Sequence, residues 1–113
     1  MKITGLALFL VFMAGQVCGD PIKARDATAH LGAIATVEGR VAVDRMPSGE
    51  IYLDLDGSKW NAPMSGYISR RNVNKFPDID ELNGKTVYIT GAIASFRKRP
   101  EIFVSDPSQV VAK

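Results

Sequence analysis

The sequence predicts a small, mostly β domain in which five short strands and one or two short helices close into a barrel. The 113-residue chain is long enough for one domain. Several segments alternate apolar and polar residues, which is the pattern of strands with one buried face. Turn-forming stretches such as Pro-Ser-Gly-Glu and Asp-Gly-Ser-Lys separate these segments. Closing the strands into a barrel would remove their exposed edges.

Residues 1–19 have the layout of a secretory signal peptide. Lys2 precedes an uncharged apolar run, and small residues follow it up to Gly19, after which cleavage is expected. The run is too short for a comfortable membrane span, so we expect no stable membrane insertion after cleavage. Lipidation at Cys18 is a less favoured alternative, because the two residues before it are larger than a lipoprotein signal requires. The expected location is the periplasm or the medium.

Cleavage would leave a mature chain that is nearly neutral and free of cysteine. Of the 14 Lys and Arg residues only Lys2 is lost, which leaves 13 cations against 12 Asp and Glu residues. A strong non-specific nucleic-acid binder is usually far more basic, so any anion binding must come from local clusters. Without disulfides, the domain must be held together by its core alone.

The mature chain begins with a lead-in extension, residues 20–32. Asp26 can cap a short helix over Ala27–Leu31, and Gly32 is a natural stop. The remaining residues, 33–113, form the predicted barrel domain.

The first strand is predicted over residues 33–46, with Val37, Val41 and Val43 on its buried face. Gly39 on that face indicates a sharp bend or bulge, as at the corner of a barrel. Four further strands are predicted, over residues 51–57, 60–70, 85–96 and 101–107.

Between the third and fourth strands the alternation stops. The apolar spacing of residues 71–84 fits a short helix, or two helical turns interrupted by Pro77. Three strands, a helix and two strands are the order of the OB-fold, a five-stranded Greek-key barrel. The sequence therefore predicts an all-β OB-fold with a helix between strands 3 and 4.

Three stretches resemble small exported OB-fold proteins of the nucleic-acid-binding, anticodon-binding-domain type. They are DATAHLGAIATVEGRV, PSGEIYLDLDG and LNGKTVYITGAIASFRKRPEIFVSDPSQV, and the resemblance spans residues 26–110. It implies the fold more specifically than the function, since OB-folds also bind oligosaccharides, peptides and proteins.

In this fold, ligands lie across strands 2 and 3, between the strand 1–2 and strand 4–5 loops. Both loops carry cations here. The outward-facing tyrosines of the strands can stack on bases, and Phe103 and Trp60 are further candidates for stacking. Three acids, Glu38, Asp54 and Glu101, are expected beside the same face. The predicted nucleic-acid-binding residues are Arg45, Tyr52, Tyr67, Arg70, Arg71, Arg97, Lys98, Arg99 and Phe103.

Nothing in the sequence indicates an enzyme, a cofactor or a metal site. His30 is the single histidine, and no serine or cysteine nucleophile has it at a recognisable spacing. The acids of residues 78–81 lack the ligand set of a hard-cation loop, so a metal-dependent hydrolase is the least favoured interpretation. The favoured one is a non-enzymatic module that binds single-stranded nucleic acid or another polyanion weakly. The alternative is a module that binds a periplasmic protein or an oligosaccharide on the same face.

Overall fold

The computed structural model describes residues 19–113, apart from the side chain of Trp60, and confirms the all-β OB-fold prediction. The predicted signal peptide lies outside the described residues except for Gly19. The barrel strands are β2 (Ile34–Arg45), β3 (Ile51–Leu55), β4 (Met64–Ile68), β5 (Thr86–Phe96) and β6 (Arg99–Phe103).

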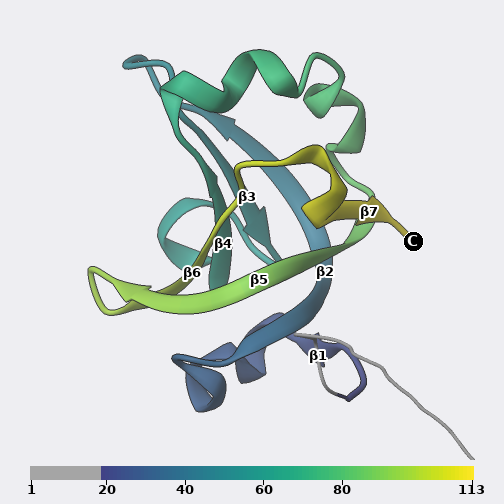
Figure 1. The fold of residues 1–113 in the computed structure, drawn as a ribbon. Helices are drawn as coiled ribbons and strands as arrows, with labels where there is room; N and C mark the ends of the chain where they lie inside the picture. Colours follow the sequence, from purple (N-terminus) through teal and green to yellow (C-terminus); the bar gives the residue numbers. More distant parts are fainter. Residues whose placement is uncertain (1–18) are drawn as a thin grey trace, which may run out of the picture.

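The strands close into a ring in the order β2-β3-β4-β6-β5, with β5 pairing back onto β2 (Figure 1). All pairs in this ring are antiparallel except β4 with β6, which is parallel. The ring thus has the strand order of a five-stranded Greek-key barrel.

The bend predicted at Gly39 is where β2 passes from one side of the barrel to the other. Residues 34–40 pair with β5, whereas residues 41–45 pair with β3. A Cβ atom at Gly39 would lie 2.8 Å from the Cβ atom of Leu55, so only glycine fits without a shift. Asp56 completes the corner, because its side chain accepts a hydrogen bond from the backbone N–H of Arg40 at 2.8 Å.

Short 3-10 helices cover the two ends of the barrel (Figure 1). At the upper end lie η4 (Arg70–Lys75) and η5 (Ile79–Leu82), which are the two helical turns that the sequence allowed around Pro77. Phe76 and Ile79 are buried there in the core.

At the lower end lies η2 (Ala24–His30), with Ala24 and Ala27 fully buried. This helix begins three residues earlier than the predicted 27–31 segment. Its N-cap is Lys23, without a side-chain cap, so the predicted capping role of Asp26 is wrong.

Further short elements extend the barrel beyond the prediction. β1 (Ile22–Lys23) pairs in parallel with β2, and β7 (Val110–Ala112) pairs antiparallel with β5. η3 (Lys59–Asn61) precedes β4, and η6 (Pro107–Gln109) follows β6. β1 and β7 are too short to show the alternation by which the longer strands were recognised.

Candidate functional site: two hollows beside an aromatic row

The outer face of β3, β4 and β6 carries a row of three aromatic rings. The strand register places Tyr52 beside Tyr67 and Tyr67 beside Phe103. The ring centroids lie 5.2 Å and 5.3 Å apart, with tilted planes. Phe103 remains 62% exposed. The structure thus brings together the three predicted aromatic site residues as one continuous surface.

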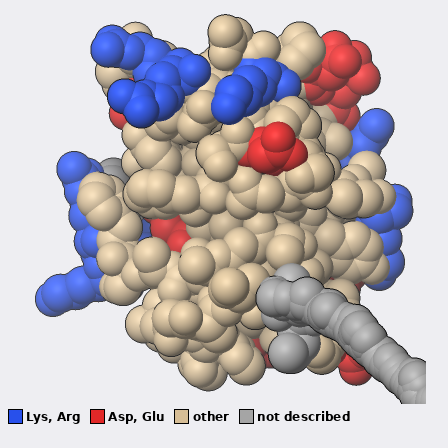
Figure 2. All heavy atoms as spheres, viewed as in Figure 1, with Lys and Arg blue, Asp and Glu red and all other residues tan. Residues whose placement is uncertain are grey.

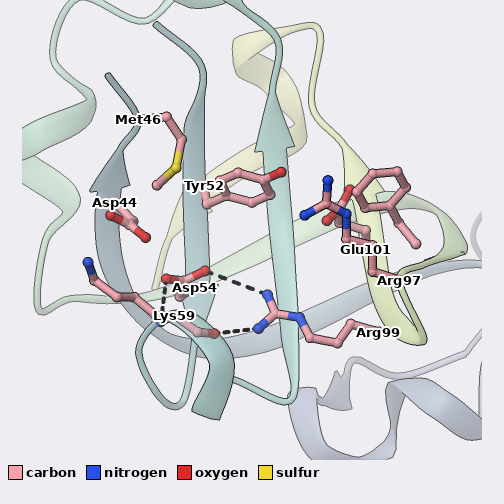
Figure 3. A pocket seen from close by; sticks show the side chains of 9 residues that line it. Asp44, Met46, Tyr52, Asp54, Lys59, Arg97, Arg99 and Glu101 are labelled. Carbon is pink, nitrogen blue, oxygen red and sulfur yellow. Dashed lines mark hydrogen bonds and ion pairs between the residues drawn. The ribbon is translucent and has the colours of Figure 1, made fainter. Parts of the chain in front are cut away.

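A first hollow, with a volume of about 330 Å³, lies between Tyr52 and the β5–β6 hairpin (Figure 3). Its walls come from β2, β3, η3, β5 and β6. The lining residues are Asp44, Met46, Tyr52, Asp54, Lys59, Phe96, Arg97, Arg99 and Glu101. The first hollow therefore combines apolar side chains with charges of both signs.

A second hollow, also of about 330 Å³, lies beside the other end of the aromatic row. Its wall includes Tyr67 and Phe103, and Arg71 is its single basic residue among those described. The remaining lining residues are Ser69, Asn72, Val104 and Ser105. The second hollow therefore has no carboxylate among the described residues.

A buried polar row lies next to the aromatic row, and the two acids of this row line the first hollow. Asp54, Ser65 and Glu101 are neighbours in the register of β3, β4 and β6, and they are 1%, 0% and 3% exposed. Asp54 accepts hydrogen bonds from the Ser65 hydroxyl at 2.7 Å and from the backbone N–H of Lys59 at 2.8 Å.

Arg99 is hydrogen-bonded to this polar row. Its guanidinium donates to the Ser65 hydroxyl at 2.7 Å and to the backbone carbonyl of Lys59. It also lies 4.0 Å from the carboxylate of Asp54 (Figure 3). A cation held in this way is a structural partner of a buried acid, so Arg99 has less freedom than its two neighbours to contact a ligand.

Glu101 is the acid that burial affects most clearly. Burial raises the pKa of its carboxyl group, and the nearby Arg99 and Arg97 offset part of that rise. Burial also raises the pKa of the Tyr52 hydroxyl, with a further contribution from the charge of Glu101. Sequence reasoning placed Glu101 beside the site but gave no sign that it is buried, because a strand pattern assigns a face without showing what covers it.

Arg97 and Lys98 form the two-residue turn of the β5–β6 hairpin. Both have positive φ, 52° and 65°, although neither is glycine. This conformation suits a tight hairpin turn, where Asn and Gly are usual, and it is strained for residues with long side chains. The Arg97 guanidinium lies 5.3 Å from the centre of the Phe96 ring, and Arg97 lines the first hollow while Lys98 does not.

The other predicted cations lie apart from the first hollow. Arg45 forms an ion pair with Asp80 on η5 at 3.0 Å, and this pairing raises its pKa. Arg70 lies against Gly49 in the β2–β3 loop, where a Cβ atom would meet its side chain at 2.9 Å. Basic side chains are visible at the left edge and at the top of the molecule, where Figure 1 places the hairpin tip and η4 (Figure 2).

Two further predicted candidates have different outcomes. Glu38 pairs with Lys23 at 3.4 Å and with Lys113 at 2.8 Å, on the sheet formed by β1, β2, β5 and β7. It therefore lies away from the aromatic row, contrary to the prediction, because it faces outward on the part of β2 that pairs with β5. The side chain of Trp60 lies outside the described part of the structure.

Residues 19–113 contain no group of three or more His, Cys, Asp or Glu residues placed to hold a metal ion. They also contain no helix long and apolar enough to cross a membrane.

Comparisons with known proteins support the fold alone. No family model and no curated protein matches the chain. Among solved structures, a protein from Leishmania major Friedlin assigned as an aspartyl-tRNA synthetase is similar over 82% of this chain, with a TM-score of 0.55 and 9% identity. The match covers 20% of that protein, so this chain spans about a fifth of its length. The hypothetical protein ygiW from E. coli is similar over 89% of this chain and 100% of its own, with a TM-score of 0.48 and 13% identity.

Proposed function

We propose that this protein is an exported, non-enzymatic OB-fold module that binds single-stranded nucleic acid across the outer face of β3, β4 and β6. The observation that carries the proposal is the continuous row of Tyr52, Tyr67 and Phe103, which has a hollow with a cation at each end. Aromatic rings stack on bases of any sequence, and each stacked base contributes about 1–3 kcal/mol.

Cations at both ends of the row are suited to the phosphates of a strand that crosses it. Arg97 lines the first hollow and Arg71 lines the second. The similar structure from Leishmania major Friedlin is named for an enzyme that acts on tRNA, which agrees with a nucleic-acid ligand. Because so few phosphates can be neutralised, binding should be weak and its salt dependence shallow.

The test is a fluorescence-anisotropy titration of the purified protein with labelled single-stranded DNA and RNA at two salt concentrations. The informative variant is Arg97→Gln with Lys98→Gln, because Arg99 has structural bonds that a binding test should leave intact. We expect weaker binding and a salt slope that is shallower by roughly 0.7 for each phosphate that the variant no longer neutralises.

The matched control removes two charges elsewhere, in Arg25→Gln with Lys85→Gln. Both side chains are exposed and neither lines a hollow. An equal loss of affinity in both double variants would mean that overall charge, and not this face, binds the strand. Binding that is unchanged between low and moderate salt would contradict the role of the cations.

A second candidate function is binding of an oligosaccharide or a periplasmic protein on the same face. Asp44 and Glu101 in the first hollow favour it, because carboxylates accept hydrogen bonds from hydroxyl and amide groups but repel phosphates. If neither DNA nor RNA binds at low salt, glycan arrays and cross-linking of exported proteins become the next experiments.

A further inference from the structure

Glu101 is a largely buried residue whose carboxylate lines a hollow and accepts no hydrogen bond from the described residues. Its side chain is 3% exposed and lines the first hollow. The groups that act on it are the charges of Arg99, Arg97 and Asp54, and no hydrogen bond to it is formed in the part of the chain that the structure describes. No buried side-chain oxygen in the described residues lacks a partner, so the unbonded oxygens of Glu101 are accessible from the hollow and can accept hydrogen bonds from a ligand.

Asp54, in the same polar row, differs from Glu101 because its carboxylate is fully hydrogen-bonded within the protein. Both of its oxygens accept hydrogen bonds, from Ser65 and from the backbone of Lys59, and Arg99 lies beside it. Ser65 lies between the two acids in the strand register, but its hydroxyl donates to Asp54. Among these two buried acids, Glu101 is therefore the one available to a ligand.

We propose that the first hollow binds one unstacked guanine, whose Watson–Crick edge donates two hydrogen bonds to Glu101 while its ring lies against Tyr52. This inference rests on the proposed function. Guanine presents two adjacent donors, the N1–H group and the exocyclic amino group, which match the two oxygens of one carboxylate. Adenine, cytosine and thymine each place an acceptor next to their donor on that edge, and this acceptor would face the carboxylate.

The rest of the first hollow suits such a base. Its volume of about 330 Å³ is at the small end of ligand pockets, which are about 300–1,000 Å³. Lys59 and Arg97 line the same hollow as donors, available to the guanine O6 atom or to a phosphate. The aromatic row then continues from Tyr52 to Tyr67 and Phe103, where neighbouring bases can stack without regard to sequence.

The test compares labelled thymidine hexamers that carry one central guanine, adenine, cytosine or hypoxanthine, titrated by fluorescence anisotropy at neutral pH. Hypoxanthine is the matched control for the ligand, since it lacks only the exocyclic amino group of guanine. We expect the guanine hexamer to bind on the order of tenfold more tightly than the adenine and cytosine hexamers, and hypoxanthine to lose most of that advantage.

The variant Glu101→Gln should bind all hexamers but lose the preference for guanine, because an amide presents only one acceptor oxygen. It is nearly isosteric and removes a buried charge, and a thermal unfolding curve verifies that it is folded. The control Glu81→Gln changes an exposed carboxylate on η5 outside both hollows and should keep the preference.

Each contrary result has its own meaning. Equal binding of all hexamers by the unmodified protein would overturn the guanine inference and leave the proposed function standing. A guanine preference that survives in Glu101→Gln would also overturn it. If no hexamer binds under any condition, the proposed function fails together with the inference.

Discussion

The two hollows lie beside the same aromatic row, but they are lined by different kinds of residue. The first hollow is lined by the buried residues Asp54 and Glu101. Arg99 also lines it, and its guanidinium donates a hydrogen bond to the Ser65 hydroxyl. The second hollow is bounded by exposed Phe103 and by Arg71, and its described lining holds no acid.

Under the proposed function, this difference predicts two kinds of recognition on one face. Buried polar groups reject a ligand that leaves them unpaired, so they discriminate between ligands. An exposed ring contributes contact area to any flat partner and discriminates little. We therefore expect the first hollow to select the ligand and the second hollow to add affinity.

The largest effect on stability should come from Arg99→Ala, which removes the cation that interacts with the buried polar row. Asp54 would lose its nearby cation, and Ser65 would lose a donor, both at buried positions. We expect the free energy of unfolding to fall by about 2–3 kcal/mol, as measured by equilibrium urea denaturation. Lys98→Ala, one residue away on the exposed turn, should change it by less than about 0.5 kcal/mol. Similar values for the two variants would show that Arg99 has no structural role.

A smaller effect, on affinity alone, is expected from Phe103→Ala in the second hollow. Loss of one stacked base should weaken binding of every hexamer by about 1–2 kcal/mol, with the preference among bases unchanged. Anisotropy titrations with the same set of hexamers measure this. Val111→Ala serves as the control, because it shortens an exposed apolar side chain on a different strand, β7. A change in base preference for Phe103→Ala would mean that the two hollows do not act separately.

The smallest effect should be the pH dependence of stability contributed by Glu101. Its pKa in the folded protein is raised above the unfolded value, because burial outweighs the attraction of Arg99 and Arg97. The protonated form is therefore favoured by folding, and this stability is fully present below the unfolded pKa and is lost as pH rises through the folded pKa.

Glu101→Gln does not titrate, so at neutral pH it should unfold at a slightly higher temperature than the unmodified protein. The gap should close as the pH is lowered toward the unfolded pKa, which thermal unfolding at a series of pH values can follow. Glu81→Gln should show no such gap. A variant that is less stable than the unmodified protein at neutral pH would mean that the arginines hold Glu101 ionised.

The sequence by itself determined the framework of this fold. Alternation placed Val37, Val41 and the strand residues of β3, β4 and β5 on the correct faces, because it depends only on local strand geometry. The bend at Gly39 was also predictable, since glycine within a strand marks a close approach or a corner. The outward position of Tyr52 and Tyr67 followed from the same alternation.

Only the tertiary structure decided what each charged residue does. Arg97, Lys98 and Arg99 are adjacent in the sequence and equivalent in charge, yet a turn with positive φ leaves two exposed and directs the third toward Asp54 and Ser65. The burial of Glu101 likewise depends on its neighbours in the closed barrel, since Asp54, Arg97 and Arg99 line the same hollow. Such interactions join residues far apart in the chain, so no local pattern records them, and the first hollow exists only once the barrel has closed.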